Sequence, residues 1–462
     1  MQTLLLLPLF VLPLGPEPDA LALFRKWRRS PSPELRIQAV HSLRGHIGRE
    51  SRVALLSLLA DPHPAVRAAV RGALVQRPPG EGPALADGIA ALRPPAARRE
   101  GLRALLARKE DPSAFAADPD PEVRARALAS GRVAVPALRA AAQSRDGRTR
   151  ALALEGLHEP ERARRHLDDP AAEVRIACAR AVDDPASLVR LLADRSWRVR
   201  LAAIRGAERL RHRNTIPALI RLLTGQPGRV QARAVQALEH LTRTAWGADA
   251  TRWKRWWAQA GGGFEVPEPR PRARPEYTRA TVTFKRIPVV SRRLSFVLDA
   301  SRSMSREAPG GGGKTRWQLL RRDLYGVLAR LPRGTRFNVF LFRTDVEAWR
   351  KRLVPATPGA RRACREWIEA ARPGGWTNLF DALKLALADD DLDTLYVLTD
   401  GVPSRGSETE RRSILAEIAF LNRYRLVQIN CVQAGSEKGL GKKWRGFLEE
   451  LAKAHDGACV RE

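Results

Sequence analysis

Residues 294–303 read LSFVLDASRS, and this stretch decides the fold of the second half of the chain. Leu294–Leu298 is a mostly apolar run of the kind buried in a parallel sheet, and a polar segment follows it at once. Strand-like and helix-like segments then alternate, which predicts an α/β doubly wound (Rossmann-like) domain with a mostly parallel sheet and helices on both faces. The predicted strands are 282–284, 294–298, 337–342, 394–399, 426–432 and 458–460, and the predicted helices are 316–331, 360–371, one from about 379, 408–422 and 443–455.

Three polar segments fall beyond the carboxyl ends of predicted strands, where sheets of this kind bind their ligands. Asp299, Ser301 and Ser303 follow the strand 294–298, Thr377 precedes a predicted helix, and Asp400 ends a later strand in the sequence TDG. These two carboxylates and three hydroxyls are hard oxygen ligands, and no His or thiolate stands among them. Such a set favours Mg²⁺, or Mn²⁺ or Ca²⁺, over zinc. We therefore take these five residues as candidate metal ligands.

The pattern D-x-S-x-S, a Thr before a helix, and T-D-G after a strand resembles the von Willebrand factor A (VWA) domain and its metal-ion-dependent adhesion site, or MIDAS. The likeness extends over residues 279–462 and includes the ending F-L-x-x-L-A at 447–452. It implies that Ser301 and Ser303 bind the metal directly and that Asp299 and Asp400 act directly or through water. It also implies that Thr377 joins when ligand binds and that an acidic side chain of a partner protein completes the coordination.

Two departures from the family pattern bear on this site. Arg302 stands between the two serines, where Gly is commonest, and so places a cation near the metal. The loop 306–313 contains four consecutive glycines.

The same loop offers a competing interpretation, a phosphate-binding loop at 308–315 that ends in Gly313-Lys314-Thr315. Ala308 stands where the first glycine belongs, and the preceding strand ends at Leu298, so the loop is far longer than a tight phosphate cradle. A Mg²⁺-dependent nucleotide hydrolase using Lys314 is therefore the alternative function. Because the domain has no nucleophile elbow and His455 is its single histidine, we expect a protein that is not an enzyme.

The first half of the chain carries a loose repeat marked by an apolar-Arg pair at the start of each predicted helix. The pairs recur every 25 to 31 residues, with Thr for the apolar residue at 149 and Gln for Arg at 231, and several follow Asp and Pro, which start helices well. The pattern D-x-x-P-x-V-R at Asp61 and Asp118 resembles HEAT repeats, which implies an α-solenoid over residues 30–258 that acts as a scaffold or binding surface. We expect the marker arginines to pair with Asp side chains of neighbouring repeats.

A linker rich in Gly, Pro and Arg, residues 259–278, separates the predicted domains. Just before it, Trp253, Trp256 and Trp257 share one face of a predicted helix, where they would cap the last repeat. The formal net charge of +31 is spread over both halves rather than gathered in one stripe, which argues against nucleic acid as the partner. The four cysteines are far apart in the sequence and are expected to be buried thiols, with a bridge between Cys431 and Cys459 left open.

Leu4–Leu14 is an apolar run too short to cross a bilayer and of the length of a signal-peptide core. With Ala20-Leu21-Ala22 as a cleavage site, it predicts a signal peptide at 1–22 and export to the periplasm or outside the cell. The absence of Lys or Arg before the run, and the prolines within it, keep a cytoplasmic location open as the alternative. The sequence thus predicts an exported protein that binds a protein partner through a divalent cation, with the solenoid as a second interaction surface.

Overall fold

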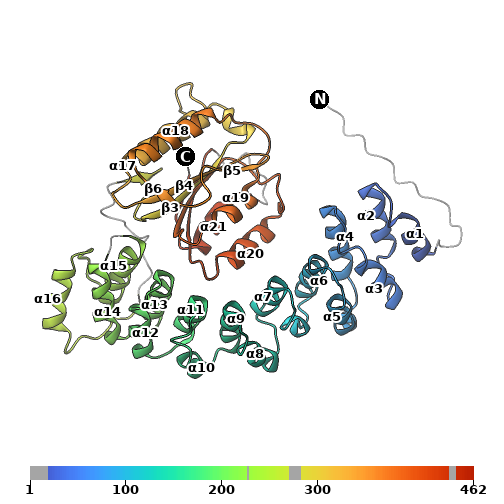
Figure 1. Ribbon diagram of the computed structural model, residues 1–462, viewed down its shortest axis with the longest axis horizontal. Helices are drawn as coiled ribbons and strands as arrows, with labels where there is room; N and C mark the ends of the chain where they lie inside the picture. Colours follow the sequence, from blue (N-terminus) through green and yellow to red (C-terminus); the bar gives the residue numbers. More distant parts are fainter. Residues whose placement is uncertain (1–18, 226–227, 270–281, 436–443, 462) are drawn as a thin grey trace. The chain divides into compact units, whose positions relative to one another are not determined.

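The structure is a computed structural model that describes residues 19–225, 228–269, 282–435 and 444–461. The chain divides into two compact units, residues 1–163 and 164–462. The first unit is helical, whereas the second holds further helices and the sheet domain (Figure 1). The helical first half and the mostly parallel sheet that follows it agree with the predicted fold class.

Helices fill the described chain from Ala20 to Ala260, and most of them start at a side-chain cap or at a first-turn proline. Asp120, for example, accepts hydrogen bonds from the backbone amides of Glu122 and Val123, and Pro121 opens the helix because its missing amide needs no partner there. The helices of the first unit are α1 (Ala20–Trp27), α2 (Pro33–Ser42), α3 (Arg49–Leu56), α4 (Pro64–Val75), α5 (Gly82–Ala90), α6 (Pro95–Ala107), α7 (Pro121–Ala129), α8 (Val135–Ala141), α9 (Gly147–Leu157) and α10 (Pro160–Arg164), the last of which reaches the boundary. Those of the second unit are α11 (Ala172–Ala181), α12 (Pro185–Leu192), α13 (Trp197–Leu210), α14 (Ile216–Arg221), α15 (Arg229–Thr242) and α16 (Ala250–Ala260).

Three of the marker arginines, Arg36, Arg98 and Arg175, pair with Asp side chains of the following repeat, as predicted. Arg98 donates from Nε and Nη2 to the two carboxylate oxygens of Asp118 at 2.8 and 2.9 Å, and both side chains are buried. Arg36 makes the same two-pronged contact with Asp61, and Arg175 makes it with Asp194. The Nη1 of each arginine also donates to two carbonyls of the turn before its own helix. These contacts fix successive repeats in register.

The last four residues of the predicted signal peptide, 19–22, belong to the described part of the chain. Residues 1–18 lie outside the described residues, but α1 begins at Ala20, ahead of the predicted solenoid start at residue 30. Asp19 caps this helix, the Ala20 side chain is buried, and the Ala20 carbonyl accepts a hydrogen bond from Ser42. The candidate cleavage site Ala20-Leu21-Ala22 therefore forms the first turn of a packed helix.

The sheet of the second unit has the strand order β5-β4-β3-β7-β8-β9, with β6 also pairing to β4. The strands are β3 (Arg293–Asp299), β4 (Arg336–Phe342), β5 (Val346–Ala348), β6 (Val354–Pro355), β7 (Thr394–Thr399), β8 (Gln428–Gln433) and β9 (Cys459–Arg461). Strands β4, β3, β7, β8 and β9 are parallel, and the short β5 and β6 are antiparallel to β4. A separate hairpin joins β1 (Thr283–Phe284) to β2 (Ile287–Pro288).

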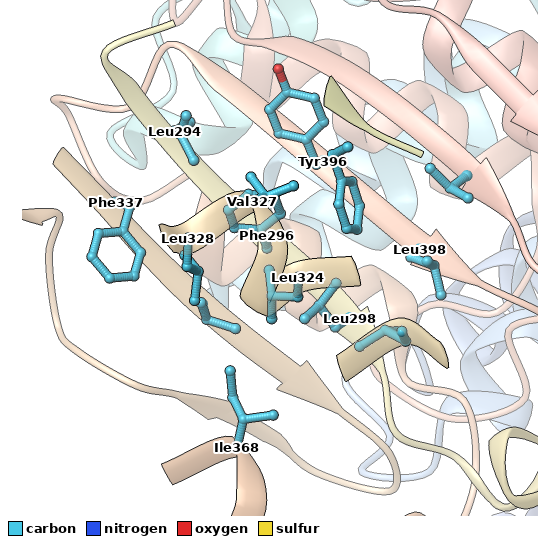
Figure 2. Close-up of a cluster of buried hydrophobic side chains, with 14 of the residues drawn as sticks. Leu294, Phe296, Leu298, Leu324, Val327, Leu328, Phe337, Ile368, Tyr396 and Leu398 are labelled. Carbon is cyan, nitrogen blue, oxygen red and sulfur yellow. The ribbon is translucent and has the colours of Figure 1, made fainter. Parts of the chain in front are cut away.

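Helices cover both faces of this sheet (Figure 1). Alternate strand residues point to opposite faces: Phe296 and Leu298 pack under α17 (Arg316–Arg330) and α18 (Pro358–Ala370), whereas Val297 packs under the other helices. Figure 2 shows the first face, with Leu324 and Val327 of α17 above the strands. The second face carries α19 (Leu379–Ala386), α20 (Arg411–Asn422) and α21 (Phe447–Ala454).

Arginines of the helical region bind the amino-terminal edge of the sheet within the second unit. Arg229, at the start of α15, is buried and donates from Nη1 to the carbonyl of Asp393 at 2.8 Å and to the carbonyl of Leu426. Arg180 of α11 donates to the carbonyl of Arg423 at 2.6 Å, and Arg205 of α13 pairs with Asp456. These contacts all lie within the second unit, and the predicted linker 259–278 stays a prediction, since residues 270–278 lie outside the described part.

The tryptophans of α16 pack against neighbouring rings, and most of the cysteines are buried. Trp253 is fully buried, donates from its indole nitrogen to the carbonyl of Gly247 at 2.9 Å, and meets Trp246 and Trp256 edge to face. All four cysteines are free thiols; three are buried and Cys459 is partly exposed, so the open question of a Cys431–Cys459 bridge is answered in the negative.

Candidate metal centre

Four of the five predicted ligands form one hydrogen-bonded chain at the carboxyl edge of the sheet. Asp299 ends β3 and is fully buried, and its Oδ1 accepts from the backbone amide of Ser301 at 2.8 Å. The hydroxyls of Ser301 and Ser303 lie 3.0 Å apart, and the Ser303 hydroxyl donates to Oδ1 of Asp400 at 2.6 Å. The order of the strands places these residues together, because β3 and β7 are adjacent and parallel and Asp400 directly follows β7.

Thr377, the fifth predicted ligand, lies against the same group. Its side chain is buried, its backbone amide donates to Ser404 at 3.1 Å, and its carbonyl accepts from the Ser404 amide. A Cβ at Gly401 would lie 3.3 Å from the Thr377 hydroxyl and 4.0 Å from the Ser303 hydroxyl. Both hydroxyls therefore face the space that the missing Gly401 side chain leaves open.

The donor set fits a hard divalent cation. Four oxygen-bearing side chains, two of them carboxylates, form the hydrogen-bonded chain, and the Thr377 hydroxyl approaches the same Gly401 position as the Ser303 hydroxyl. Across the described ranges, no three His, Cys, Asp or Glu side chains gather as ligands, so a cation held here depends on the hydroxyls. Complete burial raises the pKa of Asp299 to about 6, against hydrogen bonds from Ser301 and Thr399 that lower it. A bound cation would favour the ionised carboxylate.

Two features of the site were missed by sequence reasoning. Thr399, the last residue of β7, donates from its hydroxyl to Oδ2 of Asp299 at 2.5 Å and so orients the carboxylate. Arg316, the first residue of α17, contacts Oδ2 of Asp400 through Nη1. Thr399 stands in the TDG motif and could have been found from the pairing of the two strands. The position of Arg316 depends on where α17 lies over the sheet, which no local motif specifies.

Arg302, which the sequence places between the two serines, makes a backbone contact with the loop before Thr377. Its side chain is exposed, and its backbone amide faces the carbonyl of Gly375 at 3.4 Å. Arg302 begins a short 3₁₀ turn, Arg302–Ser305, which directs its side chain to solvent. The cation that contacts a candidate ligand is Arg316.

Several backbone amides of the glycine-rich loop donate hydrogen bonds to carbonyls of the loop or to Glu307. The amide of Ala308 donates to the carbonyl of Lys314 at 3.0 Å, and the amide of Gly311 donates to the carbonyl of Ala308 at 2.8 Å. The Gly313 amide donates to the carboxylate of Glu307 at 3.1 Å. A phosphate cradle needs such amides free, and a carboxylate inside the loop repels phosphate.

The candidate ligands thus lie at the carboxyl edge of a doubly wound, mostly parallel sheet, which is the edge where sheets of this class bind their ligands. Residues 292–457 match the family model described as von Willebrand factor type A domain. This part of the chain is a VWA domain. Domains of this family commonly bind a divalent metal at the MIDAS site and mediate interactions between proteins.

The curated relatives match only a part of the chain. The chain is 31% identical over 180 residues to inter-alpha-trypsin inhibitor heavy chain H4 of Homo sapiens, which covers 36% of this chain and 18% of that protein. It is 35% identical over 83 residues to von Willebrand factor A domain-containing protein 3B of Homo sapiens, covering 18% of this chain and 6% of that one. The chain thus spans less than a fifth of the length of either relative. A solved von Willebrand factor type A structure from Catenulispora acidiphila matches with TM-score 0.30 and 19% identity, covering 37% of this chain and 38% of that chain.

Proposed function

We propose that the VWA domain binds a protein partner through a divalent cation held by Asp299, Ser301, Ser303, Thr377 and Asp400. The observation that carries this proposal is the unbroken contact from Asp299 through both serines to Asp400, with Thr377 facing the same cradle. The cation would supply a positive centre with an open coordination position, and an acidic side chain of the partner would fill it. Mg²⁺ is the expected ion, with Mn²⁺ and Ca²⁺ as alternatives.

Calorimetric titration of the chelator-treated full chain with Mn²⁺ tests the metal centre. We expect binding by the wild type and loss of binding in Asp299→Ala. Because Asp299 is also a buried hydrogen-bond acceptor, Ser303→Ala is the second variant, and it is expected to weaken binding about tenfold or more while removing one hydroxyl. Asp345→Ala is the matched control, since Asp345 is an exposed carboxylate in the loop after β4. Equal Mn²⁺ binding by wild type, Asp299→Ala and Ser303→Ala would remove the assignment.

Partner binding requires a separate experiment. The wild type, Asp299→Ala and Asp345→Ala chains are immobilised and exposed to an extract of the native host with Mg²⁺ or with chelator. A partner bound through the cation is retained by wild type and Asp345→Ala in Mg²⁺, and is lost in chelator and from Asp299→Ala. A protein retained equally in all conditions binds elsewhere on the chain.

We infer that the protein is not an enzyme. The nucleotide-hydrolase alternative is disfavoured because the amides of Ala308, Gly311 and Lys314 donate to carbonyls within the loop and the Gly313 amide donates to the carboxylate of Glu307. Lys314→Ala is therefore expected to leave Mn²⁺ binding unchanged, and no ATP or GTP turnover is expected from the wild type. Metal-dependent turnover that disappears in Lys314→Ala would reverse this choice.

Two further elements of the proposal concern the rest of the chain. The helical region serves as a second interaction surface in a HEAT-like arrangement, which the Arg-Asp pairs between successive repeats support.

Export is proposed from the apolar run 4–14. Mass spectrometry of the native N-terminus tests it, and an intact Met1 or Gln2 on cytoplasmic material would be the contrary result. Among the described residues, no helix combines the length and apolar character that crossing a bilayer requires.

A further inference from the structure

We propose that Arg316 is a tethered cation that competes with the divalent ion for Asp400 and so sets the ion concentration at which the centre loads. This inference rests on the metal centre proposed above. Oδ1 of Asp400 accepts from Ser303 at 2.6 Å, and Nη1 of Arg316 contacts Oδ2 of the same carboxylate. Both oxygens of a fully buried carboxylate are thus engaged, and one of them by a positive charge.

The backbone around Arg316 holds it in this place. Thr315 caps α17 by accepting from the Gln318 amide, while the Gln318 side chain accepts from the Thr315 amide at 2.8 Å. This reciprocal capping box fixes the first turn of the helix. The Arg316 amide in addition donates to the carbonyl of Arg306 at 3.0 Å. The side chain therefore starts from a rigid point beside the carboxyl edge of the sheet.

Gly435 makes room for the guanidinium. A Cβ at this residue would lie 3.2 Å from both Cζ and Nη2 of Arg316, and its φ of +102° is a conformation that side chains rarely adopt. Gly435 comes two residues after β8 ends at Gln433, at the same edge as the candidate ligands. A larger residue at position 435 would therefore crowd the guanidinium of Arg316.

The guanidinium contacts Asp400 through Nη1, whereas its Nε donor is unsatisfied within the described part of the chain. Its Nε is buried and has no hydrogen-bond partner among the described residues. A cavity of about 100 Å³, lined in part by Leu319, Leu398 and Ala434, lies beside it. Because one buried donor is unsatisfied and space is adjacent, the side chain can withdraw from Asp400 when a divalent ion arrives.

Electrostatics fixes the direction of the effect. Asp299 and Asp400 together offer two negative charges to an ion, and Arg316 neutralises one of them at contact distance inside a site shielded from water. Removing this positive charge strengthens the attraction of a divalent ion to the pair. We therefore expect Arg316→Gln to bind Mn²⁺ at least about tenfold more tightly than the wild type.

The test is calorimetric titration of the full chain with Mn²⁺. Arg316→Gln is compared with Arg316→Lys, which keeps the charge, and with Arg322→Gln, which removes the same charge from the exposed surface of the same helix. We expect affinity to rise in Arg316→Gln, to stay near the wild-type value in Arg322→Gln, and to be intermediate in Arg316→Lys. Gly435→Ala gives a second route, because its Cβ crowds the guanidinium at 3.2 Å and forces it to shift while Arg316 remains, and it is also expected to tighten binding.

The outcomes separate this inference from the proposed function. If the wild type binds Mn²⁺ and Asp299→Ala does not, the metal centre stands, and unchanged or weaker binding by Arg316→Gln then overturns the role of Arg316 alone. If Arg316→Gln binds Mn²⁺ while the wild type does not, Arg316 excludes the ion completely, which supports the competition. If neither binds, both proposals are wrong. Thermal unfolding of each variant shows whether a loss of binding reflects a loss of fold.

Discussion

At the scale of single residues, His455 makes the fold sensitive to acid. Its ring is buried after α21, where Nδ1 accepts from the side-chain amide of Asn422 at 3.0 Å and Nε2 has no partner within the described residues. Burial, and after it the positive charge of Arg205, lowers the pKa of His455 to about 4. The unfolded chain then binds a proton at this residue more readily than the folded chain does.

The sign of the pH dependence follows from that difference. With a pKa near 6.5 when unfolded and about 4 when folded, His455 lowers the free energy of unfolding as pH falls through this window, by roughly 2–3 kcal/mol in all. We expect His455→Gln to lack this part of the acid sensitivity. The free energy of unfolding of wild type and of His455→Gln is measured by denaturant titration at pH 7.5 and at pH 4.5. The difference between the two proteins should change between these pH values. If it does not change, the ring is not held in its neutral form by burial.

At the scale of elements, the Arg-Asp pairs between repeats are a source of stability that can be measured. The side chains of Arg98 and Asp118 are 8% and 6% exposed, so Asp118→Ala leaves a buried guanidinium without its anion. We expect a loss of about 3 kcal/mol in the free energy of unfolding. Asp168→Ala is the control, since Asp168 and Arg190 form an exposed pair, 75% and 57%, and its cost should stay below about 1 kcal/mol. Equal costs for the two variants would contradict a structural role for the buried pair.

The elements also show what local sequence can and cannot predict. The predicted strand 394–399 agrees with β7, and the predicted helix start at Arg316 agrees with α17, which Thr315 caps. The helix predicted from 408 begins instead at Arg411, since Glu410 provides the cap, and the two- or three-residue strands β5 and β6 carry too little pattern to be found. Four candidate ligands were predicted because they follow strands, and Thr377 because it precedes a helix, whereas the role of Arg316 depends on packing between distant elements.

At the scale of the whole second unit, the helical region and the VWA domain are joined at the edge of the sheet opposite the metal centre. Asp393 directly precedes β7 and Asp400 directly follows it, so Arg229 binds at one end of the strand and the candidate ion at the other. The candidate ligands and the contacts of Arg229 therefore lie at opposite ends of the strands. The joint depends on a buried arginine whose acceptors are mostly backbone carbonyls, so the sequence of the VWA domain gave no signal of it.

Replacing Arg229 is therefore expected to loosen the joint without disturbing the metal centre. Arg229→Met keeps the apolar stem but removes the donors to Asp393 and Leu426, which should cost about 3 kcal/mol and speed hydrogen exchange in peptides covering 390–394 and 424–428. Arg221→Met, at an exposed arginine of α14, serves as the control and should change neither. Exchange in residues 299–303 and the affinity for Mn²⁺ should stay at wild-type values, because that edge lies a full strand away. Faster exchange at 299–303 in Arg229→Met would instead mean that the two edges of the sheet are coupled.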